Sequence, residues 1–367
     1  MIKEGLKKLK EKKILEALNI FNKLNESDPD NADILFFLGN IYYELNDLKK
    51  SKFYLDQSFK KFPNSQIIIN NYAIILQSLG KFEEAKKLFQ NLIKLDPNNI
   101  KAYYRLFSMN SENFDKKYLN EIKSLEEKSD LIDKSLINFI ISKYEKNKNI
   151  KNEIKYLDLA HEYQFNSRLE YNSKLTEYHT KIIANNYDKL NFSNKDKKFN
   201  FTKNKQPIFI IGLPRSGSTL IESLLTQNNE DCYSYGESSI FDFSIFNQIK
   251  KNILNKDYDN KNFNILINEE KIINSIENTY SYSKNKFIID KSLENFFYID
   301  LILKIFPKAK FIHTFRDRLD AAIAIYQSML IYLPWSQSLD NISKYILNYE
   351  KIINFFKKKH PNKILDV

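Results

Sequence analysis

A glycine-containing stretch in the second half of the chain carries the residue types of an anion-binding loop. An apolar run at residues 207–211 predicts a buried strand, and Gly212 and Gly217 bracket the turn that follows it. Ser218 and Thr219 then open an apolar periodic segment that predicts a helix. Unpaired backbone N–H groups and the dipole of the helix start point at one spot, and this arrangement favours a bound phosphate or sulfate.

Arg215 is the cation expected in this loop. The pattern is close to the nucleotide-binding pattern G-x-x-x-x-G-K-[ST], but Ser218 stands where that pattern has lysine. We therefore expect Arg215 to take the charge-neutralising role. The residues predicted to contact the anion are Arg215, Ser216, Gly217, Ser218 and Thr219.

Three further residues could do chemistry beside such a loop. Glu237 could act as a general base on an acceptor hydroxyl, and Lys291 could stabilise the charge that develops on a leaving oxygen. Arg316 is suited to a second phosphate, because its guanidinium is always charged and binds two oxygens at once. Each also has a plain structural alternative, such as a first-turn helix glutamate or a solvated lysine.

These residues follow short apolar runs that alternate with helical stretches, a pattern that predicts a parallel α/β sheet. In such sheets ligands gather at the carboxyl ends of the strands, where these residues would lie. The stretch 294–305 predicts a crossover helix, and His313 within the fourth run is interpreted as a packed, hydrogen-bonded residue. The five predicted strands are 207–211, about 231–235, 286–290, 309–315 and 363–367.

The first hundred residues repeat with a period of 34, as the prolines Pro29, Pro63 and Pro97 show. Small and aromatic positions keep the same register, with Gly5 and Gly39 one period apart. Small residues let paired helices approach closely, and proline ends the second helix of each unit. The period and these positions resemble the tetratricopeptide repeat, which implies an α-solenoid whose groove binds a peptide or protein partner.

The repeat register fades after about residue 99, although a helical pattern returns as far as Ile183. Residues 191–206 are polar and lack a period. We therefore predict a helical repeat domain at 1–190, a linker at 191–206 and an α/β domain at 207–367.

The composition excludes several classes of protein. Hydrophobic residues make up 43% of the chain, which is too many for a disordered protein, and no apolar run is long enough to cross a bilayer. The N-terminus lacks the apolar core of a signal peptide. The single cysteine, Cys232, excludes an intramolecular disulfide and a zinc site made of several thiolates, so we expect a cytoplasmic protein without a metal. The net charge of +11 comes mostly from dispersed lysine, which argues against a nucleic-acid partner.

The segment Leu213–Leu220 resembles the 5′-phosphosulfate-binding loop of sulfotransferases, and the whole chain resembles tetratricopeptide-repeat sulfotransferases, a group similar to protein-tyrosine sulfotransferases. The resemblance implies transfer of a sulfuryl group from 3′-phosphoadenosine 5′-phosphosulfate to a hydroxyl, with a peptide tyrosine among the candidate acceptors. It assigns the 5′-phosphosulfate to Arg215–Thr219 and the 3′-phosphate to Arg316. Glu237 becomes the base and Lys291 the electrostatic catalyst.

The sequence departs from the family pattern at two places. The family normally has a serine eight residues after the strand-end arginine, and here Arg316 leads to Ala324. The family also continues beyond the strand expected at 363–367, so the resemblance implies that the sequence is truncated at its C-terminal end. Two other functions stay open: a non-catalytic repeat scaffold with a decayed sulfotransferase domain, and a P-loop-type kinase, against which Ser218 argues.

Overall fold

The computed structural model describes residues 1–109, 114–193, 205–227, 229–254 and 266–367, and of 250–254 it describes the backbone alone. The chain divides into two compact units, Met1–Leu169 and Glu170–Val367. In the part that the structure describes, no helix is both long enough and apolar enough to cross a membrane.

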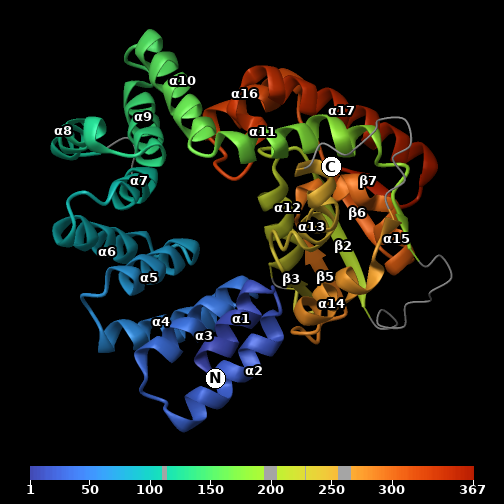
Figure 1. Cartoon of the computed structure of the whole chain (residues 1–367), viewed down its shortest axis with the longest axis horizontal. Coiled ribbons are helices and arrows are strands. Elements are labelled where there is room, and N and C mark those ends of the chain that lie inside the picture. The colour runs from blue at the N-terminus through green and yellow to red at the C-terminus, as the bar shows by residue number, and fades with distance from the viewer. Residues whose placement is uncertain (110–113, 194–204, 228, 255–265) are drawn as a thin grey trace. The chain divides into compact units, whose positions relative to one another are not determined.

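The first unit consists of helices (Figure 1), and its first six form three antiparallel hairpins. Gly5 lies under the Phe21 ring and Gly39 under Leu55, which lets the two helices of a hairpin approach closely. The repeat predicted from the sequence is confirmed here. The helices are α1 (Ile2–Lys10), α2 (Ile14–Ser27), α3 (Ala32–Glu44), α4 (Leu48–Lys61), α5 (Gln66–Ser78), α6 (Phe82–Leu95), α7 (Ile100–Met109), α8 (Lys116–Leu125), α9 (Leu131–Glu145) and α10 (Ile150–Asn166).

The second unit is built on a five-stranded parallel sheet with the strand order β3-β5-β2-β6-β7. Phe209 pairs in register with Asp290 on one side and with Phe311 on the other. The strands are β2 (Gln206–Gly212), β3 (Cys232–Ser234), β5 (Phe287–Asp290), β6 (Lys310–Thr314) and β7 (Ile364–Asp366). All five predicted strands are confirmed, with small shifts at their ends. A separate parallel pair, β1 (Asn191–Phe192) and β4 (Leu266–Ile267), was not predicted.

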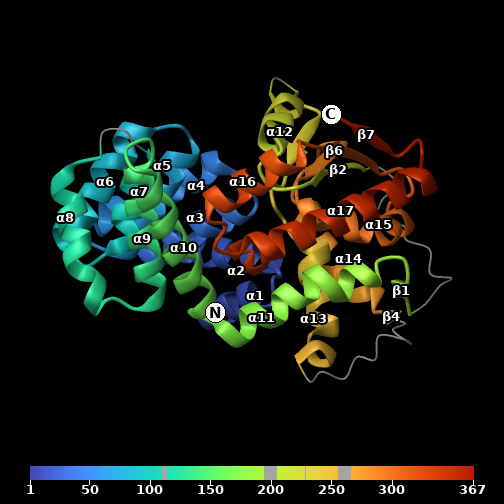
Figure 2. The same ribbon diagram turned by 90° about the horizontal axis from the view of Figure 1, so that it is seen from above.

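Helices pack on this sheet around a core of isoleucine and aromatic residues. The long helix α17 packs against α16, as Figure 2 shows from above. The predicted helix 294–305 is in two parts, because a 3-10 segment, Leu293–Tyr298, precedes α15 (Ile299–Ile305). The other helices are α11 (Leu169–Glu177), α12 (Ser218–Thr226), α13 (Ile240–Leu254), α14 (Glu269–Tyr280), α16 (Arg318–Ser328) and α17 (Leu339–Lys359).

Residues 170–190 belong to the second unit by their contacts, whereas the sequence grouped them with the repeats. Tyr178, Ile182 and Ile183 are fully buried in the core of the second unit. The apolar face of this helical segment therefore packs into the core of the second unit and not against another repeat. Of the predicted linker, residues 194–204 lie outside the described residues.

The close approach at Gly39 gives a prediction with a definite sign. At an exposed helix position, replacing glycine by alanine stabilises a protein by roughly 0.5–1 kcal/mol. At Gly39, however, a Cβ would lie 2.5 Å from Leu55 Cγ. We therefore expect Gly39→Ala to lower the midpoint of thermal unfolding. In a Leu55→Ala background the same change should cost much less, and an equal loss in both backgrounds would contradict the contact.

Candidate functional site

The loop between β2 and α12 needs glycine at both of its ends. A Cβ at Gly212, whose φ is 151°, would lie 2.4 Å from the carbonyl oxygen of Thr314 on the neighbouring strand. Gly217 has a φ of 90°, in the region that residues with side chains rarely adopt. Arg215 also has a positive φ, of 67°, and its side chain is exposed at the tip of the turn.

Ser216 fastens this loop to the sheet. Its hydroxyl lies 2.6 Å from the carbonyl oxygen of Leu213, to which it donates, and 2.7 Å from the hydroxyl of Thr314 on β6. These contacts hold the turn closed across two strands. Gly217, as the N-cap of α12, supplies no side-chain cap, so the helix start keeps its capacity to bind an anion.

Lys291, which follows β5, contacts residues from two other segments: the helix α12 and the loop after β3. Its ammonium lies 2.9 Å from Glu237 Oε1, 3.4 Å from Thr219 Oγ1 and 3.5 Å from Glu222 Oε2. Thr219, Glu237 and Lys291 were all predicted from the sequence, and the structure places them within one network. Glu222 was missed, although its position one turn after Thr219 on the same helix was a usable signal.

The charge of Lys291 depends on these neighbours. The residue is only 7% exposed. Burial by itself would lower the pKa of the ammonium, but the two carboxylates, first Glu237 and then Glu222, raise it above its usual value. Lys291 is therefore held as a cation directly beside the start of α12.

Asp290, the residue before Lys291, holds the segments that follow β3 and β5 at this edge of the sheet. It is 2% exposed and accepts a hydrogen bond of 2.8 Å from the backbone N–H of Ser292. The hydroxyls of Ser238 and Tyr280 also donate to it.

Two hydrogen bonds donated by backbone N–H groups complete this link. The N–H of Lys291 donates to the carbonyl of Gly236 over 2.8 Å, and the N–H of Ser239 donates to the hydroxyl of Ser292 over 2.7 Å. Glu237 lies between these two contacts, so its backbone is held while its side chain stays 67% exposed. An exposed carboxylate on a fixed backbone can reach an incoming group.

Arg316 follows β6 and lies next to the loop. Its Nη1 donates to the carbonyl oxygen of Arg215 over 3.4 Å, and its Nη2 lies 3.8 Å from Asp320. Its side chain is 44% exposed and available to a ligand. The helix after it, α16, begins at Arg318, so Ala324 lies in its second turn.

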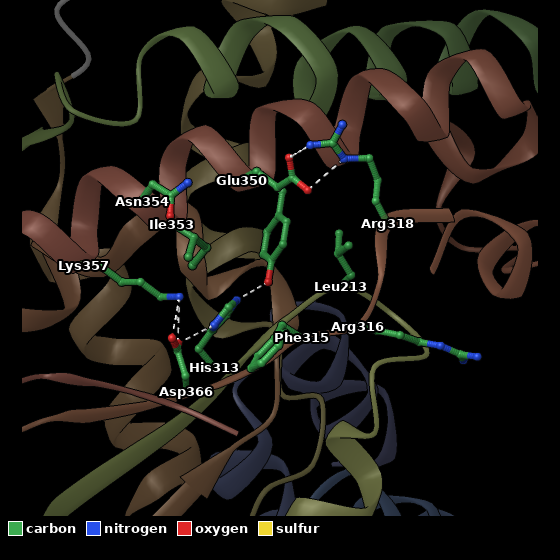
Figure 3. Close-up of a pocket in the computed structure, with 11 residues that line it drawn as sticks. Leu213, His313, Phe315, Arg316, Arg318, Glu350, Ile353, Asn354, Lys357 and Asp366 are labelled. Atoms are coloured by element: carbon green, nitrogen blue, oxygen red, sulfur yellow. Dashed lines mark hydrogen bonds and ion pairs between the residues drawn. The ribbon is translucent and has the colours of Figure 1, made fainter. Parts of the chain in front are cut away.

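A small pocket of about 210 Å³ lies beside Arg316, between β6, β7 and α17 (Figure 3). His313 spans it, with Nδ1 2.8 Å from Asp366 Oδ1 and Nε2 on the hydroxyl of Tyr349. Burial lowers the pKa of His313, although Asp366 opposes this. In Figure 3 the Arg316 side chain points away from His313. His313 is thus a packed, hydrogen-bonded residue, as the sequence predicted.

Comparisons with known proteins agree with this arrangement. Residues 207–367 match the family model described as "Sulfotransferase family", and residues 8–69 and 67–99 match tetratricopeptide-repeat models. An uncharacterized protein of Aquifex aeolicus is 27% identical over 82% of this chain and 40% of its own length. A TPR repeat-containing protein of Methanocaldococcus jannaschii is 33% identical over 29% of this chain and 18% of its own length. The chain thus spans less than half the length of these relatives.

Among solved structures, MamA is similar at 19% identity over 43% of this chain and 93% of its own, but its TM-score of 0.37 is too low to define a shared fold. The family matches, the parallel sheet and the glycine loop point to the same conclusion. Residues 207–367 of this chain are a sulfotransferase-family domain, preceded by tetratricopeptide repeats.

Proposed function

We propose that the second unit transfers a sulfuryl group from 3′-phosphoadenosine 5′-phosphosulfate to a hydroxyl acceptor. The observation that carries this proposal is the convergence of three separate segments on Lys291, whose ammonium lies 2.9 Å from Glu237 and 3.4 Å from Thr219. The sulfotransferase-family match supports the choice of donor. A peptide tyrosine is the acceptor class we favour, with the repeat groove holding the protein that bears it.

In the proposed reaction Glu237 takes the proton of the acceptor hydroxyl as the acceptor oxygen forms its bond to sulfur. The bond between sulfur and the bridging phosphate oxygen breaks, and its electron pair stays on that oxygen. Lys291 and Arg215 stabilise the charge that develops there, and adenosine 3′,5′-bisphosphate leaves. Most of the rate enhancement would come from positioning and charge neutralisation, as in phosphoryl transfer.

The site suits the nucleotide at both of its phosphate ends. The start of α12, uncapped by a side chain, and Arg215 would hold the 5′-phosphosulfate. Arg316, which lies next to the same loop, would hold the 3′-phosphate in bidentate fashion. Its hydrogen bond to the Arg215 carbonyl keeps the two cationic residues close together.

The direct test is transfer of labelled sulfate from the donor to a set of peptides with tyrosine, serine or no hydroxyl. Labelling of a tyrosine peptide alone supports the proposed acceptor. Labelling of serine peptides or of a small hydroxyl compound would keep the reaction and reject the acceptor. No labelled product with any acceptor, in a chain that does not bind the donor, would reject the function.

Glu237→Gln tests the proposed base. We expect the variant to bind adenosine 3′,5′-bisphosphate as the wild type does, because Glu237 is assigned to the acceptor proton. Turnover should fall by roughly 10²–10⁴-fold, the range typical of a lost general base. Turnover equal to that of the wild type would reject the role.

Arg215→Ala tests the loop cation. The loss of a charged hydrogen-bond partner typically costs about 1.5–3 kcal/mol, so the intact donor should bind at least tenfold more weakly. Calorimetric titration needs the donor or a non-transferable mimic, because the product lacks the sulfate. Arg168→Ala, an exposed arginine in the first unit, is the control. Donor affinity that is equal in the two variants would contradict the assignment.

Ala324→Ser uses the departure from the family pattern. A serine hydroxyl in the second turn of α16 could donate to the 3′-phosphate, for a gain of about 1.5 kcal/mol or roughly tenfold in affinity. We expect tighter binding of adenosine 3′,5′-bisphosphate and no change for adenosine 5′-phosphate. Equal gains for both ligands would indicate a packing effect, and no gain would mean that position 324 does not face the nucleotide.

A further inference from the structure

Glu222 is the carboxylate at the site to which neither the family match nor the proposed reaction gives a role. It lies on α12, one turn after Thr219, and its Oε2 is 3.5 Å from the ammonium of Lys291. Its other oxygen accepts a hydrogen bond from the hydroxyl of Ser234 on β3. Glu222 is thus held from two sides, by a strand and by a lysine.

The two carboxylates around Lys291 differ in their freedom to move. The side chain of Glu222 is 15% exposed, whereas that of Glu237 is 67% exposed. An exposed carboxylate can leave its partner and turn to a substrate. A carboxylate that is anchored and largely buried stays where it is.

The proposed reaction changes the charge of Glu237 and not that of Glu222. Once Glu237 has taken a proton it is neutral and no longer attracts Lys291. A buried ammonium without a counter-ion is costly, so it would move away or lose its own proton. Lys291 would then no longer stabilise the negative charge that develops on the leaving oxygen.

We propose that Glu222 is the positioning residue for Lys291, which it holds charged and beside the start of α12 while Glu237 exchanges protons with the acceptor. This inference rests on the proposed function for its place in the reaction. It divides the work of two carboxylates: one changes charge in each turnover, and the other keeps the ammonium in place. Ser234 contributes to this positioning, because its hydrogen bond anchors Glu222 to the sheet.

The first readout needs no turnover. Competitive labelling of the native chain with acetic anhydride over a range of pH, followed by peptide mass spectrometry, gives the labelling midpoint of each lysine. An opposite charge within about 4–6 Å typically shifts a midpoint by about 1–3 units. Since Glu222 and Glu237 both raise the pKa of Lys291, Glu222→Gln should shift its labelling midpoint to lower pH. Glu222→Asp keeps the charge and should restore most of the shift.

The matched control is Glu277→Gln, which removes one exposed carboxylate from α14 in the same unit. Its Lys291 midpoint should equal that of the wild type. If Glu222→Gln leaves the midpoint unchanged, or if the control lowers it equally, the proposal is overturned. The labelling result decides the role of Glu222 toward Lys291 even in a chain that transfers no sulfate.

The second readout separates positioning from structural damage. Glu222→Gln should bind adenosine 3′,5′-bisphosphate at least as tightly as the wild type, because it removes a negative charge near an anion. Its turnover should nevertheless fall by about ten- to hundredfold, the loss expected of a misplaced catalytic group. Weaker nucleotide binding together with a lower unfolding temperature would mean a structural role and would overturn the proposal. A wild-type chain that binds no nucleotide would instead reject the proposed function.

Discussion

The site depends on the hydrogen bonds that the buried carboxylate of Asp290 accepts. It ends β5 inside the sheet, and burial of a charge is tolerated only when hydrogen bonds satisfy it. Its donors come from three segments: the one after β5, through Ser292, the one after β3, through Ser238, and the end of α14, through Tyr280. Together with the hydrogen bonds of Gly236 and Ser239, this carboxylate holds the loop that carries Glu237 beside the strand end that carries Lys291.

The conformation of the loop between β2 and α12 likewise depends on a neighbouring strand. Its first glycine has no room for a side chain because Thr314 of β6 lies against it, and Ser216 contacts the hydroxyl of the same threonine. Since β2 and β6 are paired in parallel, this contact also places Arg316 beside the loop. The relative positions of the loop and Arg316, to which we assign the two phosphates, thus follow from the register of one strand pair.

Most of the fold could be predicted from the sequence because strands and repeats leave patterns within short stretches of the chain. Five apolar runs predicted five strands, and a 34-residue period predicted the helical hairpins. Residues 170–190 were grouped with the wrong unit because a helical period shows that one face is buried and not which core buries it. Glu222 and Asp290 escaped prediction for a related reason: their roles arise from contacts with residues 12–69 positions away, such as Ser234, Ser238 and Lys291. A sequence pattern shows the residues that a loop contains, but not the partners that reach it from other strands.

The central claim is that this loop, with an arginine and no P-loop lysine, binds the nucleotide of a sulfate donor. It is tested most directly by calorimetric titration of the whole chain with adenosine 3′,5′-bisphosphate and, separately, with ATP and magnesium. We predict binding of the bisphosphate that weakens as salt increases, because charge pairing supplies it, and at least tenfold weaker binding of ATP. Preferential binding of ATP, or binding of neither nucleotide, would contradict the account.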